Sequence, residues 1–242
     1  MRTCRNSSVE PKKRPESSSR ALLACGSVAA PLFIAGYAAA GRRQMVHGYD
    51  PRRDPVSMIV RGPGGGAQTA NFVVSGALLC ASALGARRAL AAEGASMIGT
   101  RSIPPAIGAV GVGLLGAGIF PTDIIEARAY EEGQDQGQKP TRTGALHVAF
   151  AVPVFTGMPI VCFIGARRFS ATGFRKLSRM SLGVGVCSIA AATVSGRGFS
   201  EAGRPELSRL GRRGGTFQRV AVATGLGYVS AYLCRLLLRL SD

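Results

Sequence analysis

The chain has 242 residues, of which 46% are hydrophobic and only 18% are charged, whereas soluble proteins usually carry about 25% charged residues. Its net charge is +17, but the basic residues stand in short groups between apolar runs and are not interleaved with aromatic residues. This pattern argues against an ordinary soluble domain and against a nucleic-acid partner, and it favours basic loops at a lipid bilayer, where they contact anionic headgroups.

Residues 1–20 are polar and basic, and they are rich in proline and serine. We predict that they form a disordered tail. An uncharged apolar run follows at residues 21–40. A basic stretch before such a run is also typical of a secretory signal, but this run is longer than a usual signal core and further apolar runs follow it. An uncleaved first helix is therefore favoured over a cleaved signal.

Five more apolar runs follow, and each approaches the roughly 20 residues that a helix needs to cross bilayer hydrocarbon. A soluble protein that buried so many apolar helices would need a much larger polar shell. The sequence therefore predicts an all-α fold, a polytopic transmembrane bundle of six spans over residues 21–242. The predicted spans are 21–40, 70–90, 103–121, 144–166, 180–196 and 217–240.

The third run contains a Gly-x-Gly-x-x-Gly segment that begins at Gly111, with Asp135 placed where a ribose-binding acid would stand. This dinucleotide fingerprint requires a strand before it and a helix after it. Here two prolines open an apolar run of helix length, so we predict no cofactor. Small residues at Ala109, Gly113 and Ala117 share one helical face instead, and they would let a neighbouring backbone approach closely.

The orientation follows from the basic residues beside the spans. An even number of spans places both termini on one side, and the first span follows the basic tail. Lysine and arginine are only slightly more numerous on the side of the termini. Because the first helix usually dominates orientation, we predict a multi-pass protein of the inner (plasma) membrane with both termini cytoplasmic.

Several short motifs occur in order along the chain, and the pairing of the third with the fourth is the most specific. They are Gly48-Tyr-Asp-Pro51, Phe72-Val-Val-Ser-Gly76, Gly116-Ala-Gly-Ile-Phe-Pro-Thr-Asp123, Gly144-Ala-Leu-His147 and Phe217-Gln-Arg219. Through them the chain resembles, over about residues 21–240, the bacterial and archaeal membrane family named domain of unknown function 998. The resemblance implies six spans and assigns no activity.

The same motifs carry the candidate site. Asp123 ends the third span, His147 opens the fourth, Arg219 opens the sixth, and Tyr49 and Asp50 lie in the first connection. Alternating spans place all five on one face. Ionisable groups at membrane depth are costly unless they are paired or solvated. They therefore either tie helix ends together, which is the favoured interpretation, or form a ligand, lipid or proton site.

Three functions stay open at this point. The first is a non-enzymatic membrane protein that binds a lipid or ligand or resembles a small transporter. The second is a membrane-embedded enzyme that acts on a lipid through Asp123 and His147, although two histidines make a zinc hydrolase an unattractive prediction. The third is a structural subunit of a membrane complex or homo-oligomer. We assign no catalytic residue, metal site or cofactor.

Overall fold

A computed structural model describes residues 17–94, 97–124, 140–200 and 211–240, and these residues form helices and connections but no strand. The predicted tail at residues 1–16 lies outside the described residues. The α-helices are α1 (Ser17–Gln44), α2 (Gly66–Ala92), α3 (Ile103–Ile119), α5 (Arg142–Ala171), α6 (Arg175–Ser200) and α7 (Gly214–Arg239). Three short 3-10 helices are η1 (Met45–His47), η2 (Val56–Arg61) and η3 (Gly211–Arg213).

The helices confirm the all-α prediction and correct its boundaries. Five of them exceed the predicted spans at one or both ends, so that residues 17–20 of the predicted tail already belong to α1. Backbone hydrogen bonding does not stop where the apolar run stops, and a helix continues into the polar interface with charged residues on its last turns. The exception is α3, which ends two residues early at Ile119 because Phe120 is extended before Pro121.

Within the described residues, five helices are long and apolar enough to cross a membrane, namely α1, α2, α5, α6 and α7. The α3 helix has 17 residues, which gives about 25 Å at 1.5 Å per residue and lies at the short limit for a span. It is nevertheless the most apolar segment of the bundle, and Pro104 and Pro105 occupy its first turn, where proline is tolerated. A sixth span therefore stays a prediction.

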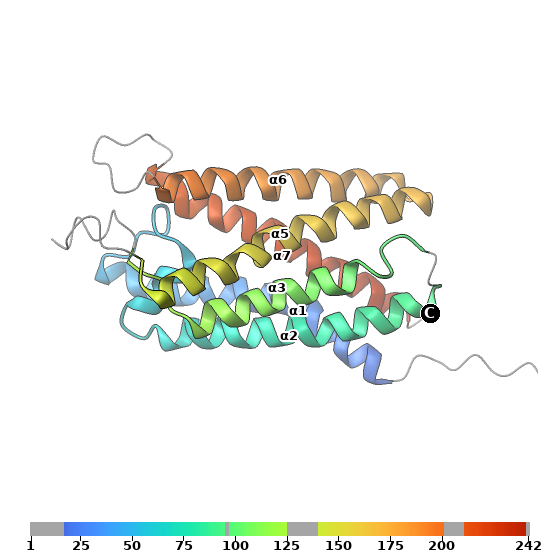
Figure 1. The fold of residues 1–242 in the computed structure, drawn as a ribbon, viewed down its shortest axis with the longest axis horizontal. Coiled ribbons are helices and arrows are strands. Elements are labelled where there is room, and N and C mark those ends of the chain that lie inside the picture. The colour runs from blue at the N-terminus through green and yellow to red at the C-terminus, as the bar shows by residue number, and fades with distance from the viewer. Residues whose placement is uncertain (1–16, 95–96, 125–139, 201–210, 241–242) are drawn as a thin grey trace, which may run out of the picture.

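The helices form a closed ring in which each packs against the next along the chain and α7 returns to α1 (Figure 1). The ends of α1 and α3 and the starts of α2, α5 and α7 lie at one end of the bundle, on the left in Figure 1, which we call the cap end. The start of α1, the α2–α3 and α5–α6 connections and the end of α7 lie at the other, which we call the tail end. This alternation matches the predicted topology.

Apolar side chains point both into and out of this ring. Leu23, Ile107 and Leu233 are fully buried in its core, whereas Val148 and Val152 of α5 are 62% and 55% exposed. A helix that is apolar on both its inner and its outer side suits lipid surroundings. The bundle is therefore a helical membrane protein, consistent with the composition.

Glycines set the closest helix crossings around α3. The backbone at Gly111 meets α2, because a Cβ added there would lie 2.8 Å from the Gly76 carbonyl oxygen and from the Cys80 nitrogen. Gly113 faces α5 in the same way, with the Phe150 carbonyl at 2.7 Å. The predicted close approach at Gly113 is thus confirmed. The Gly-x-Gly-x-x-Gly segment lies wholly inside a helix that packs two neighbours, without the strand that a dinucleotide site requires.

A serine joins the two helices that close the ring. The Ser230 hydroxyl of α7 donates to the Gly26 carbonyl at 2.6 Å and accepts from the Ala30 amide at 3.1 Å. It thereby supplements the α1 hydrogen-bond ladder just before Pro31, which lacks an amide proton. Small polar residues of this kind commonly link membrane helices.

Candidate functional site

All five predicted site residues lie at the cap end, which confirms that alternating helices bring them to one face. Tyr49 and Asp50 follow η1, Asp123 follows α3, and His147 and Arg219 lie in the second turns of α5 and α7. They do not form a single cluster. One group surrounds Arg219, and a second joins the ends of α3 and α5.

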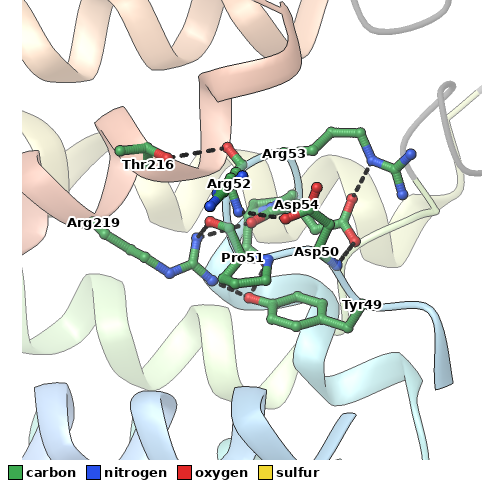
Figure 2. Close-up of polar contacts among 9 residues, drawn as sticks. Tyr49, Asp50, Pro51, Arg52, Arg53, Asp54, Thr216 and Arg219 are labelled. Atoms are coloured by element: carbon green, nitrogen blue, oxygen red, sulfur yellow. Dashed lines mark hydrogen bonds and ion pairs between the residues drawn. The ribbon is translucent and has the colours of Figure 1, made fainter. Parts of the chain in front are cut away.

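Arg219 binds the connection between α1 and α2 to α7 (Figure 2). Its Nη1 donates to the carbonyl oxygens of Pro51 at 2.6 Å, Asp54 at 3.0 Å and Gly215 at 2.9 Å, and its Nη2 donates to the Tyr49 hydroxyl. Guanidinium groups suit this task because five donors project in one plane. Arg219 therefore joins this connection to α7 by donating hydrogen bonds to its backbone carbonyl oxygens.

Tyr49 takes part in the same contact between the loop and α7. Its ring is 2% exposed, and its hydroxyl donates to the Pro55 carbonyl at 3.3 Å. Burial raises the pKa of Tyr49 to about 12, against the opposing effect of the Arg219 charge, so the phenol stays neutral at physiological pH. The Arg219 guanidinium also lies 5.6 Å from the Tyr49 ring centre and 5.9 Å from that of Tyr37, distances typical of cation–π contacts.

Asp50 has a local role in the loop, and its neighbour Asp54 is the more buried carboxylate. The Asp50 side chain accepts from the Arg52 amide at 2.9 Å, in the manner of an Asx turn. Asp54 is fully buried and accepts from the Asp50 amide at 3.0 Å and from Arg53 Nε at 3.0 Å. The sequence prediction missed Asp54, although its position beside two arginines was a usable signal.

The start of α7 holds the same loop through its backbone. The Gly215 amide donates to the Arg53 carbonyl at 3.0 Å, and the Thr216 amide donates to the Arg52 carbonyl at 2.9 Å. The first amides of a helix have no partner within the helix, so the loop carbonyls satisfy them. A side chain at position 215 would collide with the Asp54 carbonyl oxygen.

Asp123 caps the start of α5 together with Thr141. Its carboxylate accepts from the Thr141 amide at 2.9 Å and from the Thr141 hydroxyl at 2.6 Å, while that hydroxyl accepts from the Gly144 amide at 3.0 Å. A side chain at Gly144 would collide with the carboxylate. Arg61 of η2 donates to the Thr122 carbonyl at 2.6 Å and lies 3.9 Å from Asp123. A negative group is favourable at a helix N-terminus.

His147 caps the end of α3. Its Nδ1 lies 2.9 Å from the Phe120 carbonyl oxygen and 3.1 Å from that of Ala117. Because carbonyl oxygens only accept, Nδ1 carries a proton, and Nε2 of the neutral ring is an acceptor. Among the described residues, no hydrogen bond or ion pair joins His147 to Asp123. In the part of the chain that the structure describes, no three histidine, cysteine, aspartate or glutamate side chains are placed to hold a metal ion together.

A central cavity of about 50 Å³ lies beside η2 at the cap end. It is the space where most elements of the bundle meet, and it is lined by Phe33 of α1, Val56 of η2, Phe72 of α2, Leu114 of α3, Val154 of α5 and Val222 of α7. One water molecule needs about 10–15 Å³ of such space, so the cavity has room for a few non-hydrogen atoms. His147 of the second group lines this cavity directly, and from the side of Arg219 its neighbour Gln218 does so.

Three polar side chains also line the central cavity, and they are Ser57, His147 and Gln218. Gln218 Oε1 accepts from the Val56 amide at 2.7 Å. The Ser57 hydroxyl, His147 Nε2 and Gln218 Nε2 have no hydrogen-bond partner among the described residues. They offer one acceptor, one donor and one hydroxyl that can be either, in an otherwise apolar wall.

At the tail end the structure contains an ion-pair cluster that the sequence prediction missed. Arg168 is 3% exposed, and it donates to the Glu93 carboxylate at 2.6 Å and to the Ile98 carbonyl at 2.6 Å. Arg239 lies 3.7 Å from the same carboxylate. A signal was present, because Glu93 is the one acidic residue between Asp54 and Asp123.

Replacing Arg168 with methionine is expected to lower the free energy of unfolding by about 2–3 kcal/mol, since Glu93 and the Ile98 carbonyl lose a buried donor. Thermal or denaturant unfolding in detergent measures this loss. Glu93→Gln alone should cost less, and the double variant should be more stable than the sum of the single effects predicts, by about 1–2 kcal/mol. Strict additivity would contradict a coupled pair.

Comparison with known proteins identifies the family. A family model described as "Protein of unknown function (DUF998)" matches residues 27–235, which covers α2, α3, α5 and α6 completely and leaves out only the first part of α1 and the last turn of α7. No curated protein and no solved structure matches the chain. The matched segment includes Tyr49, Asp123, His147 and Arg219. The chain belongs to the DUF998 family of proteins of unknown function, and it is an integral membrane protein of unassigned activity.

Proposed function

We propose that the protein is a multi-pass membrane protein that binds a small, uncharged, mostly apolar molecule in the central cavity. The observation that carries this proposal is the set of three polar groups, from Ser57, His147 and Gln218, in an otherwise apolar cavity at the cap end of the bundle. A polar group in an apolar wall is stabilised by a hydrogen-bond partner. A ligand with one polar group that can both donate and accept would supply such a partner.

The hydrogen bonds at the cap end support ligand binding rather than hydrolysis as the function. Asp123 and His147, the two residues that the alternative of a lipid-acting enzyme would use, are each engaged with the end of a helix. Arg219 is likewise occupied by carbonyl oxygens. These contacts favour a rigid frame around the cavity. Of these three side chains, His147 keeps one nitrogen, Nε2, that is available to accept a hydrogen bond from a ligand in the cavity.

We also propose that the protein resides in the inner (plasma) membrane with its tail end cytoplasmic. The support is the basic N-terminal tail before α1, together with the basic residues in the end of α5 and the start of α6, which lie at the tail end without an acidic residue beside them in the sequence. The ligand would then reach the cavity from the opposite side or from the lipid phase.

A photoreactive primary alcohol with a short alkyl chain that carries a diazirine tests this function. In purified protein, ultraviolet light should attach the probe to residues that line the cavity, which peptide mass spectrometry identifies. Ala151→Phe fills the cavity from α5. It is expected to reduce labelling there by about tenfold or more, the loss that corresponds to roughly 1.4 kcal/mol of binding free energy.

Two controls make this result specific. Ala149→Phe adds the same ring on the exposed side of α5, two residues away, and should leave labelling of the cavity unchanged. Ser57→Ala removes only a hydroxyl. It should weaken labelling by the alcohol but not by the matching hydrocarbon probe. Equal labelling of the two phenylalanine variants, or labelling confined to lipid-facing residues, would refute the proposed function.

A further inference from the structure

A second and larger cavity lies on the outer surface of the bundle, between α2 and α3 in their tail-end halves. Its volume is about 690 Å³, within the range of roughly 300–1,000 Å³ that is usual for small-molecule sites. No residue that lines it belongs to the central cavity or to the cap-end groups. It is therefore a separate feature, and its occupancy is independent of the proposed function. We call it the α2–α3 groove.

The walls of the α2–α3 groove are apolar and open toward the bilayer. Leu84 and Val112 line it and are 54% and 49% exposed. Its floor is formed by small residues, which leave the slot open, and a Cβ added at Gly108 would lie 3.6 Å from the Ala83 side chain. The Cys80 thiol donates to the Gly108 carbonyl at 3.9 Å. A single alkyl chain fits such a slot better than a folded peptide does.

Two arginines mark the tail end of this groove. Arg87 comes from the last turns of α2, and Arg101 comes from the connection just before α3. Both are exposed, no acidic residue lines the groove, and neither guanidinium has a hydrogen-bond or ion-pair partner among the described residues. Positions near helix ends lie at the depth of lipid headgroups, where arginine side chains extend to meet phosphates. Guanidinium groups bind phosphate oxygens in a bidentate manner.

We propose that the α2–α3 groove binds one anionic phospholipid, with its phosphate between Arg87 and Arg101 and one acyl chain along Leu84, Gly108 and Val112. Charge complementarity selects this occupant, because the positive charge stands at one end of the slot and at headgroup depth. A second copy of the chain is a poorer fit. A two-fold axis along the membrane normal would place the two arginine pairs opposite each other.

Native mass spectrometry of the full chain in detergent tests this site. The protein is mixed with equal amounts of phosphatidylglycerol and phosphatidylcholine that carry identical acyl chains. The wild type is expected to retain phosphatidylglycerol in preference. The double variant Arg87→Gln, Arg101→Gln should lower that preference by about tenfold or more. Gly108→Leu should reduce binding of both lipids, because the added side chain occupies the slot.

Matched controls separate a site from general electrostatics and from crowding. The double variant Arg175→Gln, Arg179→Gln removes the same charge from exposed positions at the same end, and Gly183→Leu adds the same side chain on an exposed face of α6. Both should behave as the wild type does. Equal losses in the two arginine variants would overturn the proposal. So would a protein dimer that disappears in Gly108→Leu while lipid binding stays unchanged.

Discussion

Replacing Arg219 with alanine is expected to lower the free energy of unfolding by about 3 kcal/mol or more, a larger loss than the one expected at Arg168. The change would leave the carbonyl oxygens of Pro51 and Asp54 without their donor and would remove the charge beside two tyrosine rings. Arg219 makes several of the hydrogen bonds that join the loop to the start of α7, beside those of the Gly215 and Thr216 amides. Denaturant unfolding in detergent measures the loss.

A local measurement distinguishes the loss of this contact between the loop and α7 from a loss of stability throughout the bundle. Hydrogen exchange in Arg219→Ala should rise in the segment from Tyr49 to Arg61, whereas exchange in α6 should stay close to that of the wild type. Arg219→Lys keeps the charge but offers a point donor instead of a planar fork, so it should recover only part of the stability. Full recovery by lysine would show that charge alone matters.

Replacing Gly111 with leucine is expected to prevent α2 and α3 from packing and to abolish accumulation of folded protein. The added atoms would meet the backbone of α2 at the Gly76 carbonyl and the Cys80 amide nitrogen, and backbone cannot move aside as a flexible side chain can. Overpacking usually costs about 1–3 kcal/mol when side chains can shift, so a contact with backbone should exceed that range. Expression in membranes and unfolding in detergent measure the effect.

The alanine series at two positions of α3 provides the control for this prediction. Gly111→Ala should destabilise by about 1–3 kcal/mol. Gly108→Ala, three residues earlier, meets only the Ala83 side chain at an ordinary distance of 3.6 Å, so it should be neutral or slightly stabilising through helix propensity. If both alanines behaved alike, the crossing at Gly111 would not be the tight one.

The sequence predicted the bundle well because hydropathy reports burial in lipid directly. Long uncharged runs identified each helix, and their alternation correctly placed Tyr49, Asp123, His147 and Arg219 at one end. The helix ends were less predictable, since a helix such as α1 continues through polar residues as far as Gln44. Only in α3 did proline place the end near the end of the apolar run.

The contacts within the site could not be predicted to the same extent. Arg219 binds carbonyl oxygens in a loop 165 or more residues away in the chain, and every residue type carries a carbonyl, so no pattern identifies the partner. The Arg168–Glu93 pair spans 75 residues for the same reason. The alternation of the helices thus accounts for the end of the bundle at which these residues lie, while their partners depend on packing.

Labelling of single cysteines from one side of sealed vesicles tests the central claim, that the helices cross the bilayer in alternation. In a variant that lacks native cysteines, a membrane-impermeant maleimide should label cysteines at Arg43, Arg142 and Arg213 from one side and those at Arg101 and Ala171 from the other. Arg101 and Arg142 bracket α3, so this pair tests its passage through the membrane. Reaction of all five positions from the same side would contradict the account, and reaction of Arg101 and Arg142 together would remove the sixth span.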